Sequence, residues 1–259
     1  MGEVRIGTSG YSFKDWVGPF YPPGTGAQGM LPFYAREFDA VEVNYTYYKP
    51  PTARVMAGMV EKTPAGFRFF VKAHRTFTHE GDCSAAGDFL AALAPMREAG
   101  RLSGVLFQFP QSFKNTEANR SYLHRIAELF GAGAAVEFRD RSWDHPAVYD
   151  FLEALRLNYV AVDEPEASTL FPRVARATGD IGYLRFHSRN AANWYKEGAL
   201  RYDYLYSEAE LREWVAGLKT MAGRARDLFV FFNNCHAAQA VQNARQMREI
   251  LRQVNLWTG

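Results

Sequence analysis

The stretch Asp227-Leu-Phe-Val-Phe-Phe-Asn233 is almost continuously apolar and ends on an amide side chain. A short run of this kind, rich in β-branched and aromatic residues, is typical of a parallel strand covered by helices. Seven other runs resemble it, and amphipathic segments separate them. The eight runs are Val4–Thr8, Ala40–Asn44, Arg68–Ala73, Gly104–Phe109, Ala134–Arg139, Asn158–Asp163, Ile181–His187 and Asp227–Asn233. They start roughly 30 residues apart, the size of a βαβ unit, so the sequence predicts an α/β fold, a closed (β/α)8 TIM barrel.

The segments between the runs carry helix signals in most places. Ser207 with Glu210 has the spacing of a capping box, and Pro146 stands where a first-turn proline belongs. The sixth crossover is the exception, because Pro172 interrupts a short segment, and we expect an irregular helix there. Long loops should follow the first and seventh strands. No linker or change in composition divides residues 1–259, so we predict one domain.

Composition excludes several classes of protein. With 259 residues, 47% of them hydrophobic, the chain can bury a large core and is not disordered. A net charge of +2 is not the charge of a protein that coats nucleic acid. The two cysteines, Cys83 and Cys235, are too far apart to suggest a disulfide framework or a zinc ribbon. No signal peptide and no membrane span is visible, so we expect a cytoplasmic protein.

Polar residues gather at the carboxyl ends of the predicted strands. They are Thr8, Ser9, Glu42, Asn44, Lys72, His74, Gln108, Glu137, Arg139, Asp163, Arg185, His187, Asn233 and Asn234. Three strand ends carry two of these residues at a spacing of two, which places both on the same face of the strand. These pairs are Glu42 and Asn44, Glu137 and Arg139, and Arg185 and His187. The residues between them are apolar and suit the helix layer, so we predict that the polar faces point into the barrel. Barrel enzymes work at this end. The alternative is a buried ion-pair network that only fills the mouth, such as Glu42 with Lys72 or Glu137 with Arg185.

The same strand ends resemble a known family. The strings that carry the resemblance are Gly7-Thr-Ser-Gly-Tyr11, Val41-Glu-Val-Asn44, Phe70-Val-Lys-Ala73, Leu106-Phe-Gln-Phe-Pro110, Val136-Glu-Phe-Arg139, Val162-Asp-Glu-Pro165, Tyr183-Leu-Arg-Phe-His187 and Phe231-Phe-Asn-Asn234. In this order, over essentially the whole chain, they are similar to the YecE-like family, also called domain of unknown function 72. The resemblance implies a TIM barrel with a polar pocket at the strand ends and implies no established activity.

Our leading hypothesis is an enzyme that binds a small anionic or sugar-like substrate at the carboxyl-terminal face and uses carboxylate acid/base chemistry. A guanidinium fork matches a carboxylate or a phosphate, and nearby acids can transfer protons. The candidate catalytic residues are Glu137, Glu42 and Asp163; the candidate substrate-binding residues are Asn44, Lys72, Gln108, Arg139, Arg185, His187, Asn233, Tyr11 and Trp16. Lys72 could also form a Schiff base, but we expect Glu42 to hold it charged in an ion pair.

Aromatic residues in the loops suggest a rim around this site. The loop Ser188–Tyr206 combines them with Arg189, Lys196 and Arg201 and is long enough to act as a lid or binding loop. Stacking of bases on such residues would support the alternative, a nucleic-acid-binding protein or a metal-dependent phosphodiesterase resembling endonuclease IV-like barrels. A sensor that binds a ligand without turnover is a third possibility.

Cofactor use stays open at this point. No nucleotide or cluster motif is present, and a divalent metal is not favoured because three cations share the mouth with the acids. Reaction class and oligomeric state are not predicted.

Overall fold

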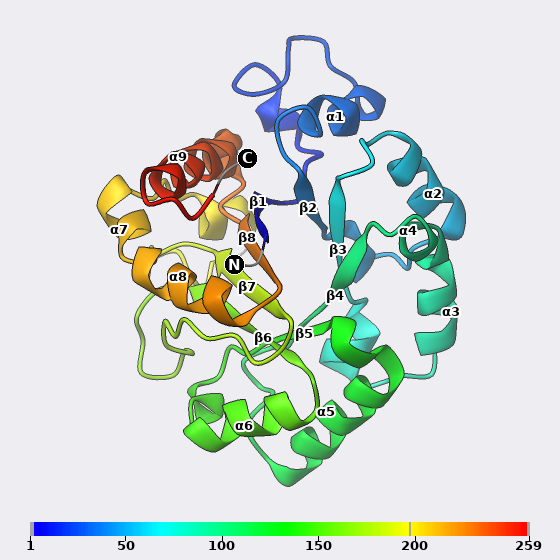
Figure 1. Cartoon of the computed structure of the whole chain (residues 1–259), viewed down its shortest axis with the longest axis vertical. Helices are drawn as coiled ribbons and strands as arrows, with labels where there is room; N and C mark the ends of the chain where they lie inside the picture. The colour runs from blue at the N-terminus through cyan, green and yellow to red at the C-terminus, as the bar shows by residue number, and fades with distance from the viewer. Residues whose placement is uncertain (1–2, 197, 258–259) are drawn as a thin grey trace.

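The computed structural model describes residues 3–196 and 198–257. Eight parallel strands close into a barrel in chain order, as predicted, and helices surround them (Figure 1). Every predicted run coincides with a strand to within two residues at either end. The strands are β1 (Glu3–Ser9), β2 (Ala40–Val43), β3 (Arg68–Lys72), β4 (Leu102–Gln108), β5 (Ala134–Glu137), β6 (Asn158–Asp163), β7 (Ile181–Phe186) and β8 (Asp227–Phe232).

The helices follow the strands in the order of a βαβ repeat. They are α1 (Ala27–Tyr34), α2 (Ala53–Glu61), α3 (Ala86–Ala92), α4 (Ala94–Glu98), α5 (Glu117–Phe130), α6 (Pro146–Ala154), α7 (Glu208–Arg212), α8 (Val215–Arg224) and α9 (Gln239–Gln253). Short helical turns lie in the loops at η1 (Lys14–Trp16), η2 (Tyr45–Tyr47), η3 (Thr76–Glu80), η4 (Gly131–Gly133), η5 (Arg141–Trp143), η6 (Gly198–Tyr202) and η7 (His236–Ala238). Pro146 opens α6, and the capping box of Ser207 and Glu210 opens α7, as predicted.

The crossover from β6 to β7 differs from the others. Residues 164–180 are all described and form no helix, so the expected irregular helix is absent. The Asn158 side chain supports this region instead. Its Nδ2 donates to the carbonyl oxygens of Ala132 and Ala134, at 2.7 and 3.0 Å, and its Oδ1 accepts from the backbone N–H of Ile181 at 3.0 Å.

The strand ladders are uneven around the barrel. β1 pairs with β2 over two residues, and β5 pairs with β6 over two, whereas the other six ladders join four to six residues of each strand. The two short ladders divide the barrel into two four-stranded halves, β2 to β5 and β6 to β8 with β1. We call the boundaries between them the β1/β2 seam and the β5/β6 seam.

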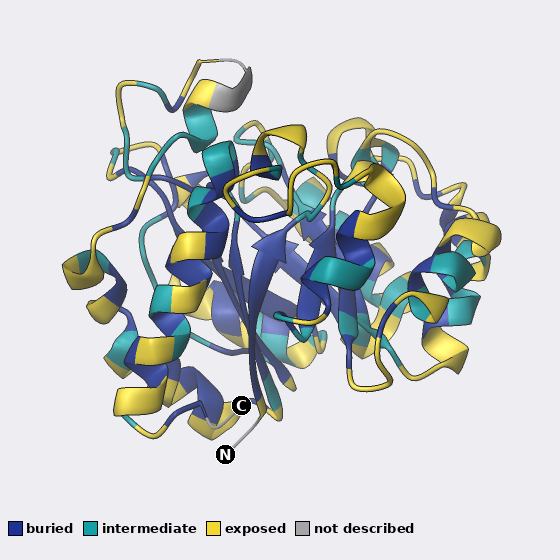
Figure 2. Ribbon diagram, turned by 90° about the horizontal axis from the view of Figure 1, so that it is seen from above, coloured by how far each residue is buried: buried dark blue, intermediate teal, exposed yellow. Residues whose placement is uncertain are grey.

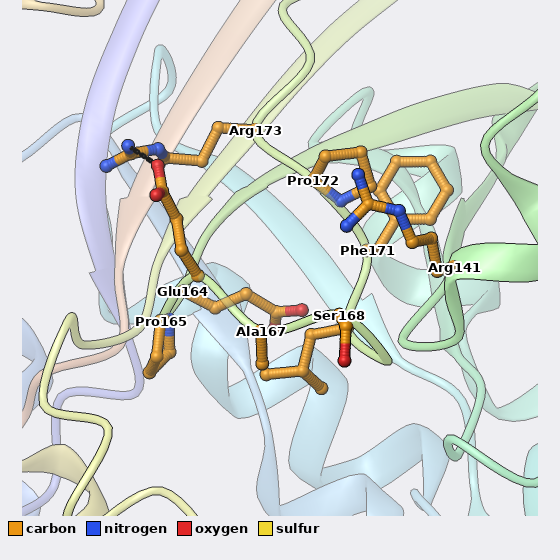
Figure 3. Close-up of a pocket in the computed structure, with 10 residues that line it drawn as sticks. Arg141, Glu164, Pro165, Ala167, Ser168, Phe171, Pro172 and Arg173 are labelled. Atoms are coloured by element: carbon orange, nitrogen blue, oxygen red, sulfur yellow. Dashed lines mark hydrogen bonds and ion pairs between the residues drawn. The ribbon is translucent and has the colours of Figure 1, made fainter.

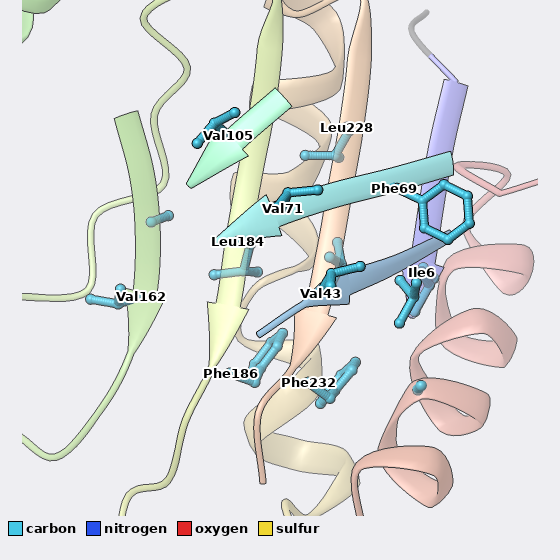
Figure 4. Close-up of a cluster of buried hydrophobic side chains, with 14 of the residues drawn as sticks. Ile6, Val43, Phe69, Val71, Val105, Val162, Leu184, Phe186, Leu228 and Phe232 are labelled. Atoms are coloured by element: carbon cyan, nitrogen blue, oxygen red, sulfur yellow. The ribbon is translucent and has the colours of Figure 1, made fainter. Parts of the chain in front are cut away.

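Side chains alternate between the barrel interior and the helix layer. Val43, Phe138 and Phe186 belong to the apolar cluster between strands and helices, as predicted, and Figure 4 shows Val43 and Phe186 within it. The lower interior is a separate apolar cluster centred on Phe70, whose ring lies 4.5 Å from that of Tyr183. Above this cluster the interior becomes polar.

The buried strands rise from a base at which both ends of the chain lie (Figure 2). The carboxyl ends of the strands form the opposite side, which we call the mouth. Among the described residues, no helix combines the length and the apolar character needed to cross a membrane.

Candidate ligand site at the barrel mouth

A buried ion cluster lies directly above the apolar interior, and Arg185 is at its centre. Its guanidinium donates to both oxygens of Glu42, from Nε to Oε2 at 2.9 Å and from Nη2 to Oε1 at 2.7 Å. The third nitrogen, Nη1, donates to Glu137 Oε2 at 2.6 Å. Tyr183 adds a hydrogen bond to Glu42 from the layer below. All four side chains are buried, so alternation has brought the predicted acids and arginine together inside the barrel.

Arg139 connects this cluster to the solvent side. Its Nη2 lies 2.6 Å from Glu137 Oε1, and its Nη1 donates to Glu164 Oε2 at 2.6 Å. Burial raises the pKa of Glu137, but Arg139 and Arg185 outweigh burial and hold that pKa well below the usual range of a glutamate. Glu137 is therefore ionised at neutral pH, and it forms ion pairs with both Arg139 and Arg185.

His187 follows β7 and extends the cluster toward β8. Burial, and next the charge of Arg139, hold the pKa of His187 well below its usual value, so the ring is neutral at physiological pH. Its Nε2 lies 2.9 Å from Arg139 Nη2 and 3.3 Å from Glu137 Oε1. Nδ1 lies 2.9 Å from the Asn233 amide. His187 and Asn233 thus lie next to the ion cluster, and of the two only His187 lines the pocket described next.

A pocket of about 330 Å³ opens above the cluster. Its lining is cationic and aromatic. The residues that line it are Tyr47, Tyr48, Lys72, His79, Gln108, Pro110, Gln111, Arg139, Leu170, His187, Trp194, Tyr195, Arg201 and Tyr202. Among the described residues, no aspartate or glutamate belongs to this lining; Glu197, from the same loop as Trp194, lies outside them. The loop after β7 contributes Trp194, Tyr195, Arg201 and Tyr202 to this lining, whereas Lys196 is not part of it and Arg189 binds Asp163 instead.

Lys72 reaches this pocket from the end of β3. Its Nζ donates to Gln108 Oε1 at 2.9 Å and lies 4.6 Å from the centre of the Tyr47 ring. Burial, and next the charge of Arg185, lower the pKa of Lys72 to about 8. The expected ion pair with Glu42 is wrong, because Arg185 and Tyr183 occupy that carboxylate.

A second pocket, of about 520 Å³, lies beside the first and is formed by the crossover from β6 to β7. Figure 3 shows Glu164, Pro165 and Arg173 on one side of it and Arg141, Phe171 and Pro172 on the other. Leu170 lines both pockets.

Glu164 lines the second pocket, and its Oε1 is buried without a hydrogen-bond partner. Burial raises the pKa of Glu164 to about 8, so this acid is protonated at neutral pH. Our sequence analysis did not select Glu164. Alternation along β6 would have found it, because residue 164 is in phase with the interior residue Val160.

The structure corrects the placement of Asp163, which does not point into the barrel. Its carboxylate accepts hydrogen bonds from Arg189 Nη2 and Trp214 Nε1, both at 2.7 Å, and from the Tyr206 hydroxyl at 3.0 Å. These partners belong to the loop after β7 and to the helix layer. Asp163 pairs in register with Phe186, an outward residue, and so it is separated from the ion cluster.

The loop after β1 is also placed differently from our expectation. Trp16 is fully buried beneath that loop, and its Nε1 donates to the carbonyl oxygen of Cys235 at 2.6 Å. Tyr11 packs near Tyr34, with ring centres 6.2 Å apart. Neither Trp16 nor Tyr11 lines the pocket at the mouth. Asn44 does not line it either, although its Oδ1 is buried without a partner.

Within residues 3–196 and 198–257, no group of three His, Cys, Asp or Glu side chains is arranged to hold a metal ion.

Comparisons with known proteins show which family this chain resembles over nearly its whole length. The family model described as "Protein of unknown function DUF72" matches residues 5–257. The UPF0759 protein YunF of Bacillus subtilis is 33% identical over 269 residues, which cover 96% of this chain and 94% of that protein. A DUF72 family protein from Thermotoga maritima has a crystal structure with a TM-score of 0.90 and 40% identity, covering 96% of this chain and 99% of that one. For a DUF72 family protein from Enterococcus faecalis the TM-score is 0.85 and the identity 28%, with 96% and 95% covered.

Proposed function

This chain belongs to the DUF72 family of proteins of unknown function, and from that premise we propose that its barrel mouth binds a small anionic molecule and acts on it as an enzyme. One observation carries the proposal. The described lining of the mouth pocket includes Lys72, Arg139 and Arg201 and no acid, although acids are abundant one layer below. The pocket therefore attracts negative charge, while the buried acids are neutralised by Arg185.

The shape of the cationic wall supports an anion that carries a flat or sugar-like part. The centre of the Trp194 ring lies 5.3 Å from the guanidinium carbon of Arg139 and 5.7 Å from that of Arg201. Guanidinium groups match carboxylate and phosphate oxygens, and an aromatic face packs against a ring or a sugar. Gln108 and His187 supply neutral polar groups that could orient such a ligand.

The buried acids beneath the pocket hold its arginines in place. Glu42 and Glu137 are held by hydrogen bonds from Arg185, and Glu137 also pairs with Arg139, so we assign both acids a positioning role beneath the pocket. Glu164 holds its proton at neutral pH, and its carboxyl group is bound to Arg139, which lines the pocket. Because Glu164 lines the second pocket and not the mouth pocket, we propose that it positions Arg139 beneath the ligand.

The test is a binding screen of the purified chain against phosphate, sugar phosphates and small carboxylates, by thermal shift and calorimetry. We expect Arg201→Ala to weaken binding of the best anion roughly tenfold or more, because a charge-assisted hydrogen bond contributes about 1.5–3 kcal/mol. Arg141→Ala is the matched control: this arginine lines only the second pocket, so affinity should not change. Equal loss in both variants, or stabilisation by oligonucleotides and by no small anion, would overturn the proposal.

A further inference from the structure

We infer that Lys72 forms an imine with the carbonyl group of an anionic ligand bound at the barrel mouth. This inference rests on the proposed anion site and adds a covalent step to it. It names the substrate class as a small aldehyde or ketone that also carries a carboxylate or a phosphate.

The surroundings of Lys72 are those of a nucleophilic amine. The two contacts described for Nζ, the Gln108 amide oxygen and the Tyr47 ring, are neutral. The carboxylate oxygens of Glu42 and Glu137 are bound by Arg185 and Arg139. No described carboxylate therefore holds the ammonium form by direct contact. The lowered pKa is consistent with this geometry and leaves roughly a tenth of the amine unprotonated at pH 7.

Lys72 also differs from every other lysine of the chain. Lys14, Lys49, Lys62, Lys114, Lys196 and Lys219 are exposed to solvent, whereas Lys72 is half-buried at the end of a barrel strand. A lysine fixed inside a pocket loses less freedom on reacting than one on a mobile surface. Its position thus favours reaction with a carbonyl group that the pocket already holds.

The pocket supplies the rest of the recognition. Arg139 and Arg201 line the same space as Lys72, so an anion bound by them brings a nearby carbonyl carbon within reach of Nζ. The nitrogen lone pair adds to that carbon and gives a carbinolamine. The carbon–oxygen bond then breaks, and the oxygen leaves as water with the two hydrogens that the amine carried. The product is a neutral imine, no electrons are gained or lost, and the step needs no co-reactant.

Two phosphate esters that differ at one carbon test this step. Pyridoxal 5′-phosphate carries an aldehyde on a flat ring, and pyridoxine 5′-phosphate carries an alcohol there and cannot form an imine. The chain is incubated with low concentrations of pyridoxal 5′-phosphate and reduced with borohydride, and the modified lysines are located by peptide mass spectrometry. Thermal shift with pyridoxine 5′-phosphate measures binding of the anion alone.

We expect modification of Lys72 at least tenfold above that of any exposed lysine, and protection by pyridoxine 5′-phosphate. Lys72→Arg should lose this modification while still binding pyridoxine 5′-phosphate within a few-fold. Lys196→Arg, in the loop that carries Trp194, should leave the labelling of Lys72 unchanged. Binding of the alcohol without preferential labelling of Lys72 would overturn the imine and leave the anion site standing. Binding of neither compound would overturn the anion site for this class of ligand, and the imine with it.

Discussion

Asp163 and Glu164 are neighbours in the chain with opposite surroundings. Asp163 faces the helix layer and accepts hydrogen bonds from Arg189, Trp214 and Tyr206. Glu164 lies on the opposite face, and its side chain is buried. Its carboxyl group and that of Glu137 both contact Arg139. Because alternation places successive side chains on opposite faces, a one-residue shift in the end of a strand decides which of the two acids belongs to the site.

The raised pKa of Glu164 predicts how stability depends on pH. An unfolded glutamate titrates near 4.3, and the folded carboxyl titrates at about 8. Between these values the folded chain retains a proton that the unfolded chain has lost, so this group lowers the free energy of unfolding by about 1.4 kcal/mol per pH unit as pH rises. Below the unfolded pKa its contribution is complete, and above about 8 it is lost.

Glu164→Gln removes the titration and keeps the size and an acceptor for Arg139. We expect the variant to match the parent chain near pH 5 and to be the more stable of the two near pH 8, as measured by urea unfolding across that range. Glu166→Gln, an exposed acid in the same crossover, is the control and should leave the pH profile of the parent unchanged. Parallel profiles for the parent and Glu164→Gln would contradict the raised pKa.

At this scale the sequence predicted the polar residues of the site better than its aromatic ones. Glu42, Glu137, Arg139, Arg185 and His187 could be selected because strand alternation constrains them. Trp16 could not be placed, because its position depends on a hydrogen bond to a residue 219 positions away in the chain. The same local sequence allows a loop tyrosine or tryptophan to pack beneath the loop or to line a pocket, so the sequence alone does not distinguish the two placements.

The strands and most of their crossovers follow one regular pattern. The barrel was predictable because eight apolar runs recur with the period of a βαβ unit, and the absence of a good helical pattern marked the crossover from β6 to β7. What no pattern showed is how the short β5/β6 seam is held. There, the Asn158 side chain hydrogen-bonds to the backbone of Ala132, Ala134 and Ile181.

Asn158→Ala should therefore destabilise the fold more than its size suggests. The substitution leaves the carbonyl oxygens of Ala132 and Ala134 and the N–H of Ile181 without their side-chain partner. Each unsatisfied buried group costs about 1–3 kcal/mol, so we expect a loss of that order or more in the free energy of unfolding in urea. Asn158→Asp, which keeps the acceptor for Ile181, should recover little, because it loses both donated bonds. A loss below about 0.5 kcal/mol in Asn158→Ala would show that the seam does not depend on this side chain.

Over the whole molecule, the ion cluster joins the two halves of the barrel. Arg185 stands on β7, and its partners Glu42 and Glu137 stand on β2 and β5, the two outer strands of the other half. Arg139 and Glu164 also pair across the β5/β6 seam. The polar layer therefore links halves that the backbone ladders connect weakly.

Arg185→Met should loosen both seams, because it leaves two buried carboxylates without their shared cation. Loss of one partner of such a cluster lowers the free energy of unfolding by about 3–5 kcal/mol. Arg185→Lys keeps the charge but not the forked hydrogen-bond donors of the guanidinium, and it should lower that free energy by less. Amide hydrogen exchange should accelerate at Ser9 and Glu42 and at Ala135 and Tyr159, which border the seams. Arg189→Met is the control, because Arg189 binds Asp163 and Glu213 within one half. Exchange that accelerates equally in both variants, or in neither, would contradict a linking role.

The position of the chain ends has a practical consequence. The described chain starts at Glu3 and stops at Trp257, and both ends lie at the base, away from the mouth (Figure 2). Any polypeptide attached before or after the barrel would leave from that side. The protein could therefore be tethered to a surface or fused to another protein by either terminus, with the pocket at the mouth still facing solution.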